Sequence, residues 1–218
     1  MIITVYKPLG KTPLEVIECY KKKHNINKIS YAGRLDPMAE GVLLLLTESD
    51  CFKQNSFHNL SKIYRFKLLI GISTDTYDCM GFITNRYNKS NNKLDIEILV
   101  KKIQEKFVGK QVQEYPPYSS VRVNGKPLWF HAKNNNLENI NIPSKEINIF
   151  SLKFMGNQKI EKNKLIRENL DIIKNINGDF RQEKIKDSWL KNSENINDYL
   201  ELLEFEAFVS CGTFIRSL

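Results

Sequence analysis

Short apolar segments separated by polar turns recur along the chain, a pattern typical of β-strands. We predict strands at residues 1–6, 41–47, 62–71, 82–87, 119–125, 145–155 and 202–210. The leucines of GVLLLLT (41–47) are continuous rather than alternating, which predicts a strand buried on both faces. The polar stretch STDTYDCMG separates residues 62–71 from 82–87, so we predict that these two strands form a hairpin with a long loop. The Asn-Gly pair that ends SSVRVNG predicts a tight turn.

Other segments space their apolar residues as helices do. We predict helices at residues 95–107, at the start of 126–136 and in two charged segments, 164–176 and 180–192. A further helix is expected to begin at Thr12-Pro13-Leu14-Glu15, which reads as a capping box with proline at the first helical position. We interpret residues 161–197 as a helical insertion. Strands outnumber helices without a repeating βαβ unit, which predicts an α+β fold with a mixed, mostly antiparallel sheet and flanking helices.

Composition limits the possible classes of partner. The 218 residues, 41% of them hydrophobic, suffice for one large domain, or for one domain with a small insertion. Lys and Arg exceed Asp and Glu by 33 − 25 = 8, which favours a polyanionic partner such as a nucleic acid. The richness in Lys, Asn and Ile also fits the coding bias of an AT-rich genome, so charge alone leaves both explanations open.

Cysteine and histidine spacing argues against a metal site. The four cysteines include no Cys-x-x-Cys pair, and the three histidines lack the spacing of metal ligands. We therefore expect reduced thiols and no metal. No segment resembles a signal peptide, and no apolar run approaches the roughly 18 residues of a membrane span. We expect a cytoplasmic protein without a membrane partner.

One carboxylate, Asp36, lies between Leu35 and Pro37 within YAGRLDPMAEGVL, residues 31–43. By itself the Asp-Pro pair predicts a helix cap. Three other short segments also have ordinary structural interpretations when each is taken singly. KPLGKT (7–12) can be a turn, the glycines of GISTDTYDCMG (71–81) can relieve a hairpin, and Arg216 can be a surface cation.

Taken together and in order, these segments resemble the motifs of the TruB family of tRNA pseudouridine-55 synthases. The family pattern runs KPxGxTS, GxLDPxAxGVL, KxY with GxxTxTxDxxG, PPxYSA and GTYIRSL. The corresponding segments here are KPLGKTP, AGRLDPMAEGVL, KIY with GISTDTYDCMG, YPPYSSVRVNGK and CGTFIRSL. The resemblance implies the pseudouridine synthase fold, one catalytic domain over residues 1–218, the T-arm of tRNA as partner and no cofactor. We also expect a monomer.

The resemblance assigns three residues to catalysis. Asp36, the aspartate of the LDP motif, is implied to be the nucleophile or charge stabiliser at the glycosidic bond. Burial beside Leu35 and the leucine strand is expected to raise its pKa, and Arg216 occupies the family position that keeps it ionised. Tyr64 matches the tyrosine against which the flipped base stacks. The alternative for Tyr64 is an aromatic side chain that faces the core.

Five more residues are implied to contact RNA. Lys7 and Lys62 are expected to bind phosphate or to be structural. Tyr31 stands where the bacterial family usually has a histidine that opens the RNA loop, and its ring can wedge between bases. Arg34 replaces a small residue, and it either touches RNA or competes with Arg216 for the carboxylate. Phe214 replaces a tyrosine, which keeps a stacking surface without the hydroxyl.

The family continues past GTYIRSL with a helix, an LxRxxxG segment and often an RNA-binding PUA domain. This sequence stops at Leu218, so we expect those parts to be absent from it. One alternative function is a non-catalytic tRNA-binding or folding module, and another is the catalytic subunit of a guide-RNA particle. A hydrolytic glycosidase is disfavoured, because no second carboxylate has a defensible position across the bond.

Overall fold

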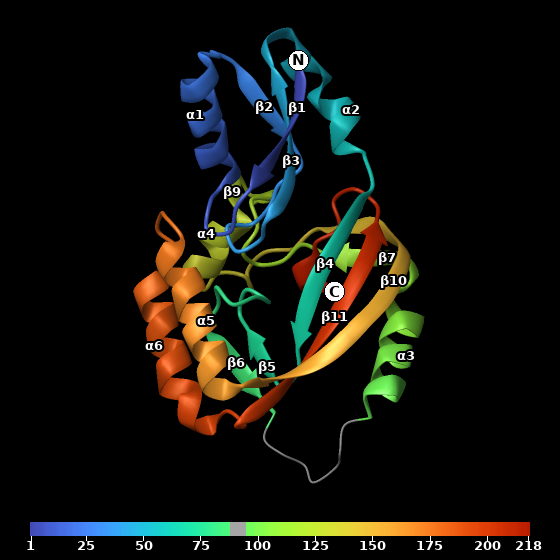
Figure 1. Cartoon of the computed structure of the whole chain (residues 1–218), viewed down its shortest axis with the longest axis vertical. Helices are drawn as coiled ribbons and strands as arrows, with labels where there is room; N and C mark the ends of the chain where they lie inside the picture. Colours follow the sequence, from blue (N-terminus) through green and yellow to red (C-terminus); the bar gives the residue numbers. More distant parts are fainter. Residues whose placement is uncertain (88–94) are drawn as a thin grey trace. The chain divides into compact units, whose positions relative to one another are not determined.

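The computed structural model describes residues 1–87 and 95–218, which form two compact units (Figure 1). The first unit comprises Met1–Leu60 and Arg167–Lys186, and the second comprises Ser61–Ile166 and Asp187–Leu218. The segment that the sequence predicts as an insertion therefore contributes to both units. Within the described ranges every strand pairing is antiparallel, which confirms the predicted α+β fold with a mostly antiparallel sheet.

The first unit is built on a three-stranded sheet in the order β1-β3-β2. Its main elements are β1 (Ile2–Lys7), α1 (Pro13–His24), β2 (Ile29–Ala32), β3 (Gly41–Thr47), the 3-10 helix η1 (Glu48–Lys53) and α2 (Gln54–His58). Ile17 of α1 packs with Leu43 and Leu45 of β3 in a buried cluster. Leu45 and Leu46 are successive residues on opposite faces and both are fully buried, whereas Val42 is 72% exposed. The predicted burial on both faces thus holds only for the later part of β3.

Helix α1 begins and ends with the local signals that the sequence carries. The Glu15 amide donates to Thr12 Oγ1 at 3.2 Å, and the Thr12 amide donates to Glu15 Oε2 at 2.7 Å, which confirms the predicted capping box. The helix ends at Asn25, which adopts the left-handed conformation with φ of 51° and donates its amide to the Lys21 carbonyl. These contacts fix where α1 begins, directly after the KPLGKT loop (residues 7–12).

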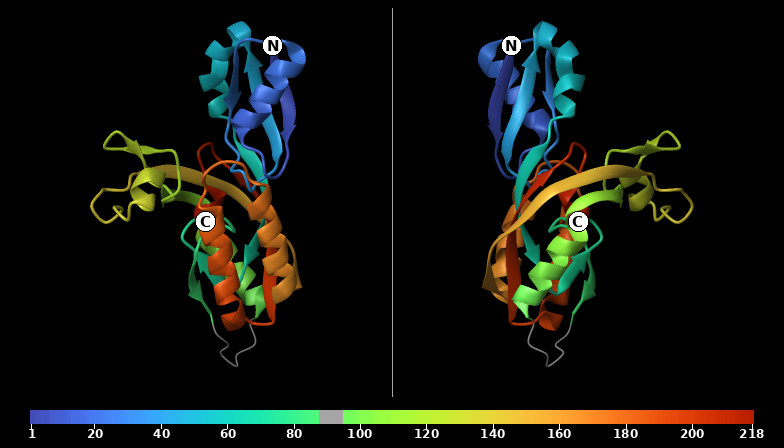
Figure 2. Two further views of the ribbon diagram at one scale, coloured as in Figure 1. Left: turned by 90° about the vertical axis from the view of Figure 1, so that its left-hand side faces the viewer. Right: turned by 90° about the vertical axis from the view of Figure 1, so that its right-hand side faces the viewer.

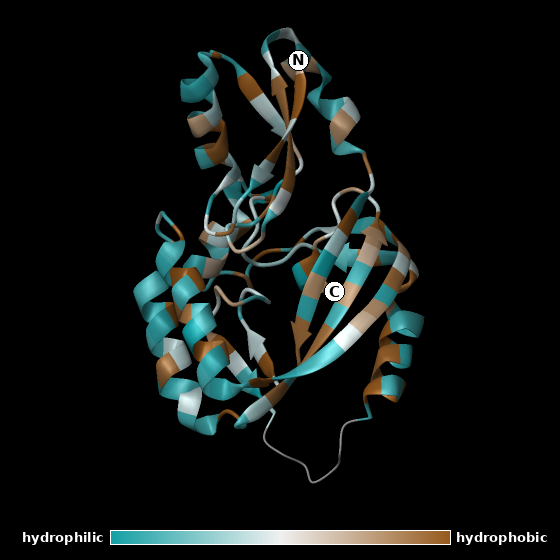
Figure 3. Ribbon diagram, in the orientation of Figure 1, coloured by the Kyte–Doolittle hydropathy of each residue, from teal (hydrophilic) through white to brown (hydrophobic). Residues whose placement is uncertain are grey.

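The second unit is built on a four-stranded sheet in the order β4-β11-β10-β7. The strands are β4 (Lys62–Leu69), β7 (Gly109–Glu114), β10 (Ser144–Glu161) and β11 (Tyr199–Val209). Helix α3 (Ile96–Phe107) alternates hydrophobic and hydrophilic bands along its length (Figure 3). Its Val100 joins a buried cluster with Ile147 of β10 and Phe205 of β11, so the core of this unit lies between α3 and one face of the sheet.

Smaller elements complete the second unit. They are β5 (Ile72–Thr74), β6 (Ile83–Arg86), β8 (Arg122–Val123), β9 (Lys126–Pro127), α4 (Leu128–Lys133) and the 3-10 helices η2 (Ser193–Asn195) and η3 (Ile215–Ser217). Asn124 and Gly125 join β8 to β9 with φ of 50° and 76°, as a tight type I′ turn requires, which confirms the predicted Asn-Gly turn. In side view the segment with β8, β9 and α4 projects away from the four-stranded sheet (Figure 2).

The predicted hairpin between residues 62–71 and 82–87 is wrong. β4 pairs with β11 instead, from Lys62 opposite Val209 to Leu69 opposite Leu202, and β6 pairs with the three-residue strand β5. Pairing with β11 lets Tyr64 and Phe66 of β4 pack on the same buried cluster as Phe205. Because β11 is distant from β4 in the sequence, the order of the segments along the chain did not predict this pairing.

The two charged segments form the predicted helices, α5 (Lys162–Asn175) and α6 (Gln182–Asn192). Each has a buried apolar side: Ile173 of α5 and Ile185 of α6 are fully buried, and Trp189 is 2% exposed. Among the described residues, no helix combines the length and the apolar character needed to cross a membrane.

Candidate active site

The segment that carries Asp36 is a turn between β2 and β3, not the start of a helix. The Ala39 amide donates to the Asp36 carbonyl at 3.0 Å, and the Gly10 amide donates to the Pro37 carbonyl at 2.8 Å. The helix-cap interpretation of Asp-Pro is therefore wrong. Asp36 is also exposed, which contradicts the expected burial, because this turn precedes the leucine strand and does not share its packing.

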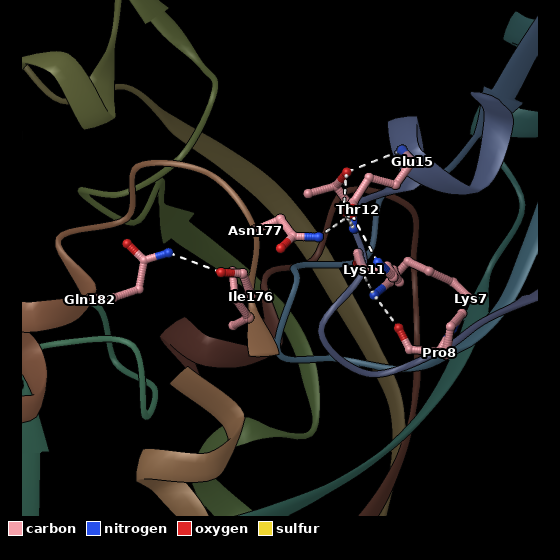
Figure 4. Close-up of polar contacts among 8 residues, drawn as sticks. All are labelled: Lys7, Pro8, Lys11, Thr12, Glu15, Ile176, Asn177 and Gln182. Atoms are coloured by element: carbon pink, nitrogen blue, oxygen red, sulfur yellow. Dashed lines mark hydrogen bonds and ion pairs between the residues drawn. The ribbon is translucent and has the colours of Figure 1, made fainter. Parts of the chain in front are cut away.

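Lys7 closes the neighbouring KPLGKT loop from inside. It is the last residue of β1, opposite Gly41, and it is fully buried. Its Nζ donates to the carbonyls of Pro8 at 3.2 Å and Lys11 at 2.6 Å (Figure 4). Burial lowers the pKa of Lys7, while the carboxylate of Asp36 counteracts that effect. Of the two roles that the sequence leaves open for Lys7, these contacts are those of a structural lysine.

Glu15 organises the other side of the loop. It accepts the Thr12 amide at 2.7 Å and the side-chain amide of Asn177, from the connection between α5 and α6, at 2.8 Å (Figure 4). The backbone hydrogen bond from Thr12 and then the bond from Asn177 lower the pKa of Glu15 from 4.5 to about 2. The ionised form of Glu15 thus stabilises the folded first unit.

We expect Glu15→Gln to destabilise the protein less at low pH than at neutral pH. Because the folded-state pKa is depressed, the contribution of Glu15 is present above 4.5 and is lost as the pH falls toward about 2. After discounting for solvent screening at this partly exposed site, the loss should be about 1 kcal/mol near pH 7. Urea unfolding of both proteins at about pH 7 and about pH 3 measures the change. An equal difference at both pH values would contradict the assignment.

In the second unit, Arg216 contacts backbone carbonyls and a carboxylate. Its Nη1 donates to the Thr76 carbonyl at 2.8 Å, its Nη2 donates to the Tyr118 carbonyl at 3.2 Å, and its Nε lies 3.5 Å from Asp78 Oδ2. The side chains of Arg216 and Asp78 are only 11% and 7% exposed. The guanidinium is therefore fixed in a largely dehydrated environment, with a carboxylate that the sequence analysis did not assign to the site.

Hydrogen bonds within residues 74–81, the loop that binds Arg216, explain the spacing of the GxxTxTxDxxG motif. Thr74 Oγ1 accepts the Asp78 amide at 3.0 Å, and Asp78 Oδ1 accepts the Thr76 hydroxyl at 2.6 Å and the Met80 amide at 2.8 Å. A Cβ on Gly81 would lie 2.4 Å from Thr76 Oγ1, so only glycine fits there. We call residues 74–81 the Arg216-binding loop. The aspartate in the GxxTxTxDxxG pattern was the signal in the sequence that pointed to Asp78.

The remaining predicted residues have varied surroundings. Tyr64 pairs with Ala207 of β11 and packs against the buried cluster of the second unit. This packing is what the alternative interpretation, an aromatic side chain that faces the core, predicts. Tyr31 packs against the buried cluster of the first unit, and Arg34 is exposed in the turn before Asp36. Burial lowers the pKa of Lys62, which is half-buried on β4. Their contacts with RNA stay predictions.

Phe214 is fixed at the backbone. Its amide donates to Gln113 Oε1 and its carbonyl accepts from Gln113 Nε2, both at 2.9 Å, and its ring meets Tyr115 edge-on at 5.6 Å between centroids. Gln113, a nearly buried side chain on β7, was not predicted from the sequence. It anchors the segment that leads to Arg216.

Asp36 belongs to the first unit, and Arg216 and Tyr64 belong to the second. The expected pairing of Asp36 with Arg216 therefore stays a prediction. Among residues 1–87 and 95–218, no group of three or more His, Cys, Asp or Glu is arranged to hold a metal ion.

Comparison with known proteins decides the family. Residues 21–170 match the model of the TruB family pseudouridylate synthase (N terminal domain). The chain belongs to the TruB family. It is 34% identical over 160 residues to tRNA pseudouridine synthase B of Mesoplasma florum, covering 73% of this chain and 55% of that protein. It is also 34% identical over 163 residues to the synthase of Lactococcus lactis subsp. cremoris SK11, covering 75% and 48%. The chain thus spans about half the length of these relatives.

Solved structures agree with this family membership at the level of the fold. The crystal structure of a Cbf5-Nop10-Gar1 complex contains a chain that matches 99% of this one, with a TM-score of 0.52 at 17% identity, over 41% of its own length. A chain in the structure of the H/ACA RNP bound to a substrate RNA containing 2'-deoxyuridine also matches 99% of this chain, over 39% of its own length, with a TM-score of 0.51 at 16% identity. These likenesses confirm the predicted pseudouridine synthase fold of this TruB-family domain.

Proposed function

We propose that the protein is a tRNA pseudouridine synthase that isomerises the uridine at position 55 of the T-loop. In this reaction the bond between N1 of the base and C1′ of the ribose breaks, the base turns, and C5 bonds to C1′. C5 loses a proton and N1 regains one, so the reaction needs no oxidant or reductant. Asp36 acts as the carboxylate at C1′. The observation that carries the proposal is the exposed Asp36 on a turn fixed by the KPLGKT loop, inside the segment that matches the family.

Residues 1–218 form one catalytic domain with a helical insertion at 161–197 in this proposal. Arg216 pairs with Asp36 during the reaction. Tyr64 stacks on the flipped base, and Tyr31 and Phe214 offer further aromatic surface. Arg34 and Lys62 contact phosphates, while Lys7 supports the loop from inside. The protein acts as a cytoplasmic monomer.

The segment with β8, β9 and α4 supports RNA as the partner. Lys126 Nζ lies 4.4 Å from the centre of the Phe130 ring, and Lys133 Nζ lies 5.7 Å from that of Trp129, which is 41% exposed. Residues 115–137 include no Asp or Glu. Exposed aromatic rings accompanied by cations suit both stacking on bases and attraction to phosphates. This surface therefore supports the T-arm of tRNA as the proposed partner.

The direct test uses an unmodified tRNA transcript without guide RNA. After incubation with the protein, pseudouridine is mapped by carbodiimide-dependent stops in reverse transcription. We expect a stop that reports position 55, and none in a transcript with cytidine at that position. Salt-dependent binding of tRNA without any product would contradict catalysis and favour the non-catalytic binding module. A requirement for guide RNA would instead favour the subunit of a guide-RNA particle.

A further inference from the structure

Helix α6 of the insertion lies along the end of the Arg216-binding loop and the strand that follows. The Trp189 indole Nε1 donates to the Gly81 carbonyl at 3.2 Å, the Ile83 amide donates to Ser188 Oγ at 3.2 Å, and Arg86 donates to the Asn192 side chain at 2.5 Å. Positions 188, 189 and 192 fall on one side of a helix. Their partners, residues 81, 83 and 86, lie in the end of the Arg216-binding loop and in β6. Three hydrogen bonds therefore join one side of α6 to this segment.

Trp189 acts at the tightest point of the loop. The chain folds back so closely at Gly81 that a Cβ there would also lie 2.6 Å from Asp75 Oδ1. The Trp189 side chain is 2% exposed, and its hydrogen bond satisfies a carbonyl that is buried with it. Because Gly81 lies close to Thr76, the position of Gly81 constrains two of the groups that hold Arg216, namely the Thr76 carbonyl and the Asp78 carboxylate.

The α5–α6 connection, in the middle of the insertion, meets the KPLGKT loop within the first unit. Asn177 donates to Glu15 at 2.8 Å, and Gly10, with φ of 85°, approaches so closely that a Cβ on it would lie 3.0 Å from the Asn175 carbonyl. Gln182 holds the connection itself, because its Nε2 donates to the Ile176 carbonyl at 3.0 Å (Figure 4). Its Oε1 also accepts the Phe180 amide at 2.9 Å. The Gly10 amide in turn holds the turn of Asp36.

We propose that the helical insertion is a positioning element of the active site. Helix α6 holds the Arg216-binding loop in the second unit, and the α5–α6 connection holds the KPLGKT loop in the first. The residues involved are positioning residues, since they act through the backbone and side chains that they bind. The inference rests on the proposed function for its catalytic consequence, but the ordering of the two loops is measurable without any substrate.

The first test compares two serines of the same segment. The Ser188 hydroxyl accepts the Ile83 amide, whereas the Ser193 hydroxyl donates to the Leu190 carbonyl of its own segment. In the full chain without tRNA, we expect Trp189→Phe and Ser188→Ala to speed amide hydrogen exchange in residues 74–86 by about fivefold or more. Ser193→Ala should leave that exchange unchanged. With tRNA, kcat should fall roughly three- to tenfold for Trp189→Phe while KM changes less than about twofold.

The second test compares two asparagines of the α5–α6 connection. The Asn177 side chain donates to Glu15, whereas the Asn175 side chain donates to the Asp171 carbonyl of its own helix. Asn175 approaches Gly10 with its backbone carbonyl, which Asn175→Ala keeps. We expect Asn177→Ala to speed exchange in the segment 8–15 about threefold, and Asn175→Ala to leave it unchanged. Since the Asp36 turn is bonded to Gly10, kcat should fall in the Asn177 variant only.

Unchanged exchange in both loops would overturn the proposal, as would equal effects of each variant and its matched control. Ser188→Ala removes one hydroxyl and keeps the helix, so it decides the first test even if Trp189→Phe fails to fold. If the wild-type chain forms no pseudouridine, the proposed function fails, yet the exchange comparison still decides whether the insertion orders the two loops.

Discussion

Asp36→Asn is expected to abolish pseudouridine formation while leaving the binding of tRNA intact. The substitution keeps the size of the side chain and removes the negative charge and the nucleophilic oxygen at the proposed reaction centre. Losing the nucleophile of a covalent mechanism should lower kcat on the order of 1,000-fold or more. Because Asp36 is exposed on a turn that backbone hydrogen bonds define, the unfolding free energy should change by less than about 0.5 kcal/mol. Single-turnover product formation and filter binding measure the two properties separately.

Glu40→Gln provides the matched control for Asp36→Asn. Glu40 is another exposed carboxylate of the same segment, four residues further along, and its charge also acts on Lys7. Neutralising it should leave the rate within about threefold of wild type. Equal rates for wild type and Asp36→Asn would refute the catalytic assignment, and equal losses in both variants would show that the charge balance around Lys7, not the carboxylate itself, sets the rate.

Features that depend on neighbours in the sequence were predictable. The Thr12–Glu15 capping box and the Asn124-Gly125 turn are each complete within a few residues, so the pattern alone defines their geometry. Helices α5 and α6 were equally clear, because each carries an apolar side. The pairing of β4 with β11 was not predictable, since it depends on packing between segments far apart along the chain.

Strand β7 was missed because its pattern is inverted. Val112 is 70% exposed, whereas Gln113 is nearly buried and bonds both backbone groups of Phe214. A polar residue that faces inward reads as a loop in a hydrophobicity pattern. Burial inferred from neighbouring residues also failed at the site. The resemblance supplied Asp36 and Arg216, but the expected burial of Asp36 was inferred from its apolar neighbours in the sequence. Asp36 is exposed, because its turn does not share the packing of those neighbours.

Asp78→Ala is expected to cause the largest loss of stability. Its carboxylate lies 3.5 Å from Arg216 Nε and accepts hydrogen bonds from the Thr76 hydroxyl and the Met80 amide. The Asp78 side chain is only 7% exposed. Removing it leaves the guanidinium in a largely buried site without that partner, which should lower the unfolding free energy by about 3–5 kcal/mol. Asp187→Ala, at an exposed position on α6, should change it by less than about 0.5 kcal/mol. Urea unfolding monitored by circular dichroism measures both.

The double variant Asp78→Ala/Arg216→Met separates the pair from the rest of the loop. If the cost in Asp78→Ala comes mainly from the uncompensated guanidinium, replacing Arg216 with a flexible apolar side chain should recover roughly 1–3 kcal/mol. Activity should not return, because the proposed mechanism still needs the cation beside Asp36. Recovery of stability without activity would therefore assign two roles to Arg216, as the partner of Asp78 in the fold and as the partner of Asp36 in the reaction. Additive losses in the double variant would instead mean that Asp78 stabilises the loop through its hydrogen bonds with Thr76 and Met80 and not through Arg216.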